Sequence, residues 1–156
     1  MTNELDTQAR ALHDSVTELV KRYQFRDRQE ICCFGISVSQ CHTLSTLSQH
    51  GAQPMGELAE AMRLKVSSMT RVVDQLVDKK LVRRDPDPKD RRVCTIALTA
   101  KGKNLFEKIE GELLEMEKQV LSQVAPKDRA NLIQALGALT EAVDKWRACH
   151  LEEGCC

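Results

Sequence analysis

Aromatic residues are scarce in this sequence, which has one Trp, one Tyr and three Phe among 156 residues. Apolar residues of all kinds still make up 42% of the chain, so Leu, Val, Ala and Met must fill most of its core. This composition favours helices that pack on other helices. The length fits one domain, or one compact module with further helices for oligomerisation.

Long apolar runs are missing as well. No segment approaches the roughly 18 consecutive apolar residues that a membrane-spanning helix needs. The N-terminal residues are polar and acidic, unlike a signal peptide. We therefore expect a cytoplasmic protein with no membrane partner. In that compartment the seven cysteines indicate packing, metal binding or redox chemistry rather than a disulfide framework.

Sequence patterns that mark several enzyme classes are absent too. The chain has no Gly-rich phosphate loop, no Cys-x-x-Cys pair and no cluster of carboxylates. We therefore expect that the chain is not an enzyme, with a thiol-dependent enzyme as the remote alternative.

The chain has no net charge, but its charges are unevenly distributed. Between Arg63 and Arg92, ten basic residues outnumber five acidic ones, which gives this segment a charge of +5 and the remainder −5. A basic segment between acidic ends can present a positive face to DNA while the whole protein stays neutral.

Hydrophobic periodicity predicts helices at both ends of the chain. Apolar residues at helical spacing define a first helix over 7–23, and the charged run 21–30 then leads to a break or turn at Gly35. Further along, Thr99 is placed to cap a long helix and Pro126 to open the last one. The final segment, 151–156, is expected to be a flexible tail.

The middle of the chain predicts a helix-turn-helix. Ser37 and Gln40 form a capping box at the start of a second helix, which ends at Gly51 because glycine readily adopts a left-handed conformation. Pro54 suits the first position of a third helix. A tight turn at 63–65 then leads to a fourth helix over 66–80, and two short helices joined in this way form a helix-turn-helix.

A β-hairpin is predicted after the fourth helix. Residues 81–84 and 93–98 have the composition of strands, and alternation in the second places Cys94 on the same face as Ile96 and Leu98, where packing is expected. Residues 85–92 contain two Pro and three Asp together with Lys and Arg, which predicts a charged loop. Hairpin and loop together form a wing.

Four segments of this region resemble the signature of the MarR family of transcriptional regulators: 71–77, 81–84, 87–92 and 98–102. The resemblance extends over nearly the whole chain. It implies a mainly α fold with a small β-hairpin wing, that is, a winged helix-turn-helix with N- and C-terminal dimerisation helices. The implied parts are a dimerisation helix and linker (1–36), the DNA-binding region (37–98), the C-terminal dimerisation helices (99–150) and a Cys-containing tail (151–156).

Two residues depart from the family pattern. Lys65 stands where the family often has a Ser or Thr that caps the recognition helix, so that cap must come from elsewhere or be absent. Lys80 stands where the family usually has a Gly that ends this helix. Because a left-handed conformation costs a non-Gly residue on the order of 1 kcal/mol, we expect a differently built turn.

The fourth helix carries the predicted DNA-reading residues. One face is apolar, whereas the other has hydroxyls small enough to let the backbone approach the major groove and an Arg that can reach a phosphate or a guanine. An ordinary solvent-exposed face is the alternative. The predicted contacts of this helix are Lys65, Ser67, Ser68, Thr70, Arg71 and Gln75.

The wing supplies a second set of contacts. The resemblance implies that Arg92 enters the minor groove and is held by Asp90. A narrow, negative groove favours Arg, and an Asp can fix the guanidinium through two hydrogen bonds. Lys89 and Arg91 are then phosphate contacts, with a surface salt bridge as the alternative for Arg91.

Half-site geometry predicts a dimer. One winged helix reads only a few base pairs, whereas two symmetric copies one helical turn apart read a palindrome. The resemblance implies that the first and the last two helices interlock in a homodimer. The expected partner is therefore double-stranded DNA with a palindromic operator, bound by a repressor that also responds to a small effector.

Two adjacent cysteine pairs suggest how an effector is sensed. Neighbouring thiolates can bind one thiophilic centre, and trivalent arsenic takes three. Cys32 and Cys33, completed by Cys155, Cys156 or Cys41, form the hypothetical site, with As(III) or another thiophilic metal as the effector. Packing is the alternative to metal binding for Cys41. Cys149 lies outside this site and is expected to pack or to be exposed.

Two other inputs are compatible with the same sequence. In the first, a thiolate reacts with an oxidant or electrophile. In the second, a small aromatic ligand occupies an apolar pocket and the cysteines are incidental. Both leave DNA binding unchanged as the output.

Overall fold

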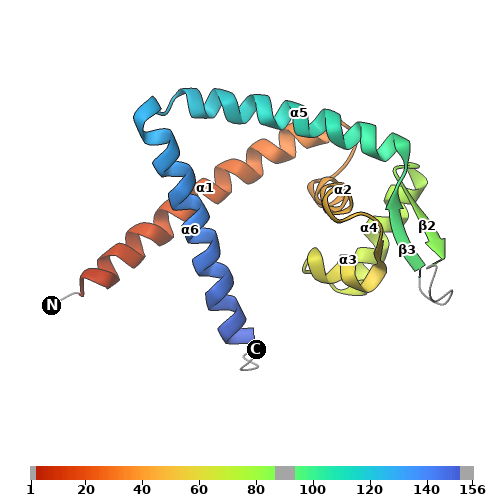
Figure 1. Ribbon diagram of the computed structural model, residues 1–156, viewed down its shortest axis with the longest axis horizontal. Coiled ribbons are helices and arrows are strands. Elements are labelled where there is room, and N and C mark those ends of the chain that lie inside the picture. The colour runs from red at the N-terminus through yellow and green to blue at the C-terminus, as the bar shows by residue number, and fades with distance from the viewer. Residues whose placement is uncertain (1–2, 87–93, 152–156) are drawn as a thin grey trace. The chain divides into compact units, whose positions relative to one another are not determined.

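The computed structural model describes residues 3–86 and 94–151, without the side chains of Cys32 and Leu151 (Figure 1). The described elements are, in chain order, α1 (Glu4–Cys32), α2 (Val38–His50), β1 (Gln53–Pro54), α3 (Met55–Ala61), α4 (Val66–Asp78), β2 (Val82–Pro86), β3 (Cys94–Leu98), α5 (Ala100–Ser122) and α6 (Pro126–Leu151). The fold is therefore mainly helical with a small antiparallel sheet, as predicted. Within these ranges no helix is both long and apolar enough to cross a bilayer. The chain divides into two units, and the boundary in the sequence follows Gly111. Each unit is described separately.

α1 extends well beyond the predicted range 7–23. Asn3 caps its first turn by accepting a hydrogen bond from the amide of Leu5, and the helix continues through the charged run 21–30 to Cys32. The last turn packs on the core, where Ile31 is 1% exposed. Arg26 forms an ion pair with Asp27 and lies 4.1 Å from the centre of the Tyr23 ring. The predicted turn at Gly35 is present, with a φ of 70°.

α2 begins and ends as its sequence predicts, whereas the segment that follows differs. Ser37 Oγ accepts from the amide of Gln40, and Gln40 Oε1 accepts from the amide of Ser37, both at 3.2 Å. Gly51 ends the helix with a φ of 78°. Pro54 was expected to be the first residue of α3. It belongs instead to the two-residue strand β1, which pairs with β3.

α3 and α4 form the predicted helix-turn-helix. The turn between them contains Arg63, whose φ is 54°. Lys65 precedes α4 without a side-chain hydrogen bond to its first turn, so the recognition helix lacks a side-chain cap. α4 buries Met69, Val73 and Leu76 on one face. It ends at Asp78, two residues before the predicted end.

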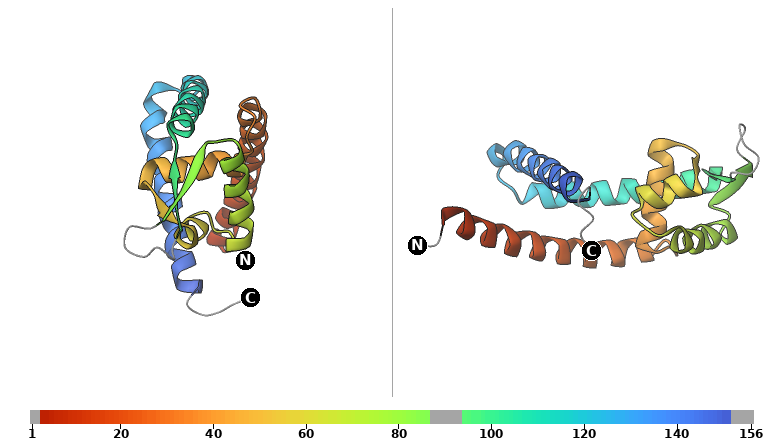
Figure 2. Two further views of the ribbon diagram at one scale, coloured as in Figure 1. Left: turned by 90° about the vertical axis from the view of Figure 1, so that its right-hand side faces the viewer. Right: turned by 90° about the horizontal axis from the view of Figure 1, so that it is seen from below.

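β3 is the middle strand of the sheet, between β1 and β2 (Figure 2). β2 pairs with it from Val82 opposite Leu98 to Pro86 opposite Cys94, and so starts one residue later than expected. Simple alternation fails in β3 because three consecutive residues, 95–97, are buried. Cys94 is exposed, which corrects the expectation that it packs with Ile96.

The core of the first unit lies between α2, α4, the sheet and the start of α5. Leu44, Met69 and Ile96 have no exposed surface, and Ile109 of α5 is 1% exposed. Thr99 caps α5, as predicted, because its hydroxyl oxygen accepts from the amide of Gly102 at 3.0 Å.

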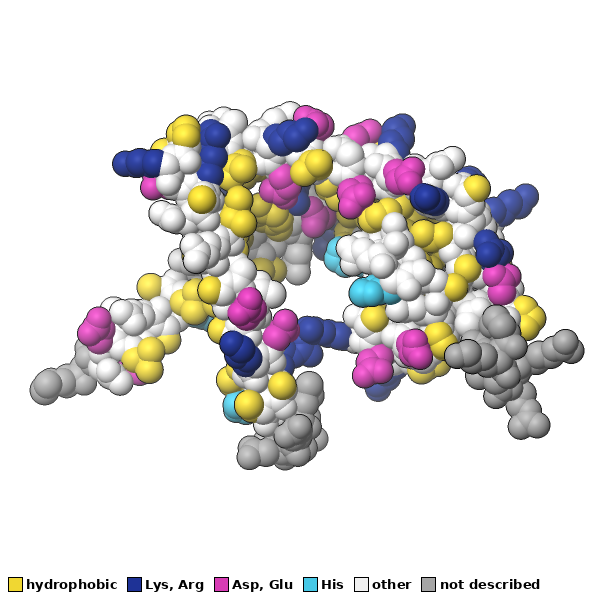
Figure 3. All heavy atoms as spheres, in the orientation of Figure 1, with side chains coloured by type: hydrophobic (Ala, Val, Ile, Leu, Met, Phe, Trp, Pro, Cys, Tyr) yellow, Lys and Arg dark blue, Asp and Glu magenta, His cyan; other side chains and the backbone are white. Residues whose placement is uncertain are grey.

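The second unit consists of the end of α5 and all of α6. Pro126 opens α6 as predicted, but no described residue of this helix is buried. Apolar side chains at helical spacing are exposed instead, and several are visible on its surface in Figure 3. The large ones are Leu132, Ile133, Leu136, Val143 and Trp146.

Candidate nucleic-acid interface

The outer face of α4, opposite its buried residues, presents a hydroxyl-rich surface with one arginine. Ser67, Ser68 and Arg71 are exposed. Arg71 makes no hydrogen bond or ion pair with the part of the chain that the structure describes. A free guanidinium between small hydroxyls can approach a phosphate or the edge of a guanine.

The first turn of α4 adds backbone donors to this surface. Its N-cap residue, Lys65, is exposed and does not bond to the amides of the first turn. The amides at the start of a helix have no partner within the helix, and the helix dipole favours an anion at this end. The missing cap, a departure from the family pattern, thus leaves these amides free for a phosphate.

Two of the six predicted contacts of this helix have partners inside the protein. Thr70 Oγ1 donates to the carbonyl of Val66 at 2.8 Å, a bond within the helix. Gln75 Oε1 accepts from Nε2 of Gln40 at 2.7 Å. Nothing in the sequence pattern indicates this second bond, because the two glutamines are 35 positions apart.

One ion pair connects the wing strand to α4 and a second lies within that strand, and sequence reasoning missed both. Arg84 of β2 pairs with Asp74 of α4. Arg83 pairs with Asp85 and also donates to the carbonyl of Leu98 on β3. Two basic residues of the segment with a charge of +5 therefore have acidic partners. The predicted wing contacts Lys89, Asp90, Arg91 and Arg92 lie outside the described residues and stay predictions.

The end of α4 is joined to the start of α5. Lys80 adopts the left-handed conformation, with a φ of 60°, so the turn keeps the geometry that a glycine would have and is not built differently. Its amide donates to Val77 and its carbonyl accepts from Thr99 Oγ1 at 2.8 Å. Gly102 is required here because a Cβ at this position would overlap the carbonyl oxygen of Leu81.

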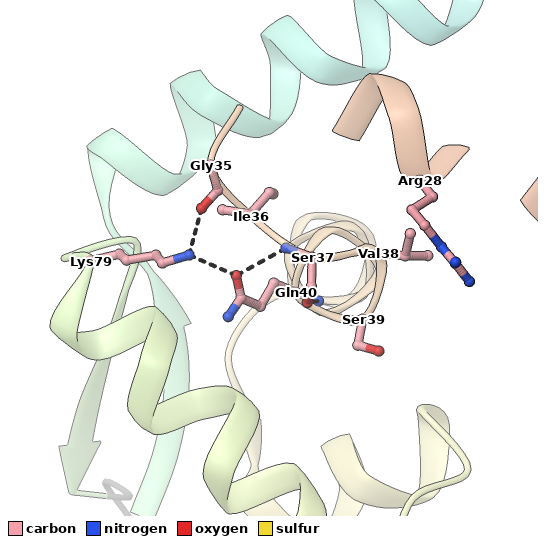
Figure 4. A pocket seen from close by; sticks show the side chains of 8 residues that line it. All are labelled: Arg28, Gly35, Ile36, Ser37, Val38, Ser39, Gln40 and Lys79. Atoms are coloured by element: carbon pink, nitrogen blue, oxygen red, sulfur yellow. Dashed lines mark hydrogen bonds between the residues drawn. The ribbon is translucent and has the colours of Figure 1, made fainter. Parts of the chain in front are cut away.

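A third connection joins α4 to the start of α2. Lys79 Nζ donates to the carbonyl of Gly35 at 2.5 Å and to Gln40 Oε1 at 3.0 Å (Figure 4). These residues border an open pocket of about 640 Å³, which Arg28 of α1 also lines.

The predicted sensor cysteines differ in environment. Cys33 is exposed, and its Sγ donates to the carbonyl of Gln29. Cys41 is buried in the core, and burial, together with the nearby charge of Asp27, raises the pKa of its thiol to about 11. Cys94 and Cys149 are exposed.

The side chains of the other cysteines of the hypothetical site lie outside the described ranges. The side chain of Cys32 and both Cys155 and Cys156 are outside the described part of the structure. Within that part, no three His, Cys, Asp or Glu side chains are grouped to hold a metal ion.

Comparisons with known proteins match this region and its flanking helices. The model of the MarR family matches residues 36–94, from the turn before α2 to the first residue of β3. The uncharacterised HTH-type transcriptional regulator ML2140 of Mycobacterium leprae is 31% identical over 144 residues, which are 90% of this chain and 98% of the relative. The HTH-type transcriptional repressor MdtR of Bacillus subtilis is 28% identical over 120 residues, 77% of each protein.

Solved structures give the same match. RV1404 from Mycobacterium tuberculosis superposes with a TM-score of 0.73 at 30% identity, covering 92% of this chain and 97% of that one. Wild-type MarR from E. coli, in its apo form, has a TM-score of 0.74 at 19% identity, covering 82% of this chain and 95% of its own, which is a likeness of fold.

Proposed function

The chain belongs to the MarR family of DNA-binding transcriptional regulators, and on this premise we propose that it is a cytoplasmic repressor that binds a palindromic operator as a homodimer. The observation that carries the proposal is the free outer face of α4, with Ser67, Ser68 and Arg71 exposed opposite a fully apolar inner face. The relative MdtR, which is named a repressor, supports the direction of control.

The reading helix supplies both positioning and specificity in this proposal. The hydroxyls of Ser67 and Ser68 and the uncapped amides of the first turn hold phosphates, and these contacts fix the register of the protein on the duplex. Arg71 reads a base edge, with guanine as the preferred partner. The wing adds Arg92 in the minor groove, oriented by Asp90, with Lys89 and Arg91 on phosphates.

Exposed apolar side chains support the dimer. The stripe on α6, which includes Leu136 and Trp146, is unburied within its own unit. On α1, Leu5, Leu12 and Leu19 are also exposed. A single chain that leaves this much apolar surface in water gains from covering it with a second copy.

The test starts from a random DNA library. The wild-type chain should select duplexes with a palindromic consensus, and Arg71→Ala should lose roughly tenfold or more in affinity for them, as expected for one bidentate base contact. Lys127→Ala, which removes the same charge from the exposed start of α6, is the matched control and should bind like the wild type. Equal affinity of the Arg71 variant and the wild type would contradict the reading role.

For the effector, we propose that thiol chemistry at Cys32 and Cys33 lowers DNA affinity, with trivalent arsenic or another thiophilic metal as the input. The exposure of Cys33 supports this assignment, because a reagent can reach its thiol. The raised pKa of Cys41 makes it a poor thiolate donor and favours packing for this residue. A three-thiolate site that contains Cys32 and Cys33 is therefore completed by Cys155 or Cys156 of the tail.

Release from a selected duplex distinguishes the inputs. Arsenite or cadmium should release the wild type but not Cys32→Ser/Cys33→Ser, whereas the exposed control Cys149→Ser should respond like the wild type. Release by hydroperoxide alone would favour the oxidant alternative, and release by salicylate alone the aromatic ligand. A double variant that every thiol reagent releases as well as the wild type would exclude this pair as the sensor.

A further inference from the structure

We propose that Gln40 and Lys79 are positioning residues for DNA reading, which fix the rotation of α4 by holding it to the start of α2 and to the turn 33–36. This inference rests on the proposed DNA-binding function. It assigns a role to two residues that do not themselves face DNA, and it changes the role of Gln75 from a DNA contact to an anchor.

The side-chain amide of Gln40 has a fixed orientation. Gln40 is only 3% exposed, and its Oε1 accepts from Lys79 Nζ at 3.0 Å and from the amide of Ser37 at 3.2 Å. Both partners are donors, so the oxygen must face them and Nε2 must point the other way. Nε2 donates to Gln75 Oε1 at 2.7 Å. The amide therefore holds Gln75 in one place.

Lys79 forms the second attachment. It is the C-cap residue of α4, and its ammonium donates to the Gly35 carbonyl at 2.5 Å as well as to Gln40 (Figure 4). Hydrogen bonds from a charged donor are stronger than those between neutral groups. A cation at this end also interacts favourably with the helix dipole.

The two attachments lie on the same row of α4 as the proposed DNA contacts. Ser67, Arg71, Gln75 and Lys79 follow one another at intervals of four residues, so they form one ridge along the helix. The first two are exposed and have no side-chain partner among the described residues, and the last two are bonded to α2 and the turn. Attachment at two points one turn apart fixes the rotation of the helix. Base reading needs side chains placed within about 0.5 Å, which this attachment provides.

The turn is held from a second side as well. Lys108 of α5 lies 5.5 Å from the centre of the Phe34 ring, next to the Gly35 carbonyl that Lys79 binds. A distortion of the turn thus changes the position of the Gly35 carbonyl and, through Lys79, that of α4. Because Gly35 has a φ of 70° and open space around it, Gly35→Ala strains the turn without a steric clash.

The experiment compares affinity for a duplex selected by the wild type with affinity for a scrambled duplex of the same composition. Gln40→Met and Lys79→Met should each weaken binding to the selected duplex about tenfold, the equivalent of one charge-assisted hydrogen bond. Affinity for the scrambled duplex should stay within about twofold, because phosphate contacts dominate it. Lys79→Arg, which keeps the charge and donors, should recover most of the loss.

Salt dependence separates positioning from direct phosphate contact. Affinity for DNA falls as salt rises, and between about 50 and 200 mM salt the loss of one phosphate contact reduces the steepness of log affinity against log salt by about 0.9. We expect the slopes of Gln40→Met and Lys79→Met to equal that of the wild type. A lowered slope for Lys79→Met, with equal losses on both duplexes, would show a direct contact and overturn the inference. So would variants that are less stable yet keep the wild-type preference for the selected duplex.

A double-variant series tests the link to the turn. Gly35→Ala should weaken selected-duplex binding, and it should add little to Lys79→Met because both interrupt the same connection. Gly51→Ala is the matched control: its φ is 78°, its surroundings are equally open, and it should keep the preference. Additive losses for Gly35→Ala and Lys79→Met would overturn this inference and leave the proposed DNA-binding function standing. A wild-type chain that selects no duplex would instead overturn the proposed function on which it rests.

Discussion

Arg84 Nη2, on the wing strand β2, lies 2.5 Å from Oδ1 of Asp74 on α4. Both side chains are partly exposed, so the pair contributes little to stability, at most about 1 kcal/mol. Its importance lies in charge. Asp74 neutralises a basic residue beside the outer face of α4 and places a carboxylate on the surface proposed to contact DNA.

Asp74→Asn should therefore strengthen DNA binding. The change removes one negative charge and frees Arg84, so affinity should rise several-fold and the salt slope should steepen by up to about 0.9. Fluorescence anisotropy with a selected duplex measures both. Asp78→Asn is the control, because Asp78 is exposed on the same helix and forms no ion pair with another described residue. Equal gains in the two variants would show that releasing Arg84 contributes nothing.

Gly102→Ala should destabilise the fold. A Cβ at this position overlaps the Leu81 carbonyl, which is backbone and cannot move away alone, so we expect a loss of about 1–3 kcal/mol in the free energy of unfolding. Gly111→Ala, in the same helix but with open space around it, should instead gain up to about 1 kcal/mol. Urea denaturation followed by circular dichroism measures both. A neutral Gly102 variant would mean that α5 does not approach Leu81 so closely.

Lys80→Gly should stabilise the chain by up to about 1 kcal/mol. Lys80 holds a φ of 60°, which is unfavourable for a residue with a Cβ and free for glycine. Asp78→Gly, at the last residue of α4, should lose a few tenths of a kcal/mol because glycine is a slightly weaker helix former than aspartate. The thermal unfolding midpoints of the two variants should move in opposite directions. A lower midpoint for Lys80→Gly would indicate that the lysine side chain contributes more than the strain removes.

The stability of the chain should fall between pH 9 and 11 because of Cys41. Burial raises the pKa of its thiol from 9.0 to about 11 in the folded state. Below pH 9 the thiol is protonated in both states; above it only the unfolded chain releases the proton, which favours unfolding. The loss should reach about 2–3 kcal/mol near pH 11. Cys41→Ala is the control, because every other titrating group is the same in both proteins. The difference in the free energy of unfolding between wild type and variant should therefore change over this interval by the amount that the wild type loses through Cys41. A constant difference would contradict the raised pKa.

Local chemistry made the helix-turn-helix and the starts of three other helices predictable. The capping box at Ser37, the cap at Thr99 and the opening of α6 at Pro126 each depend on residues within a few positions, and all three are present. The end of α1 was missed because a charged run lacks an apolar stripe, although its side chains pair with one another. β1 was missed because two residues form a strand only through distant pairing with β3.

The candidate site was predictable as a face but not as a network. Periodicity alone separates the outer face of α4 from its apolar face, so Ser67, Ser68 and Arg71 could be chosen correctly as exposed. It could not show that Gln75 bonds to Gln40, since that contact depends on how α2 packs beside α4. Lys79 was counted as part of a basic segment, whereas its ammonium is directed to a carbonyl and an amide oxygen.

The placement of two prolines has a consequence for assembly. Pro54 lies in β1 and Pro86 ends β2, and these are the two edge strands of the described sheet. A proline has no amide hydrogen to offer an incoming strand, and β1 is only two residues long. The sheet is thus a poor template for strand addition and cross-β aggregation. A chain that exposes apolar helices for a partner is in this way protected from associating through its wing.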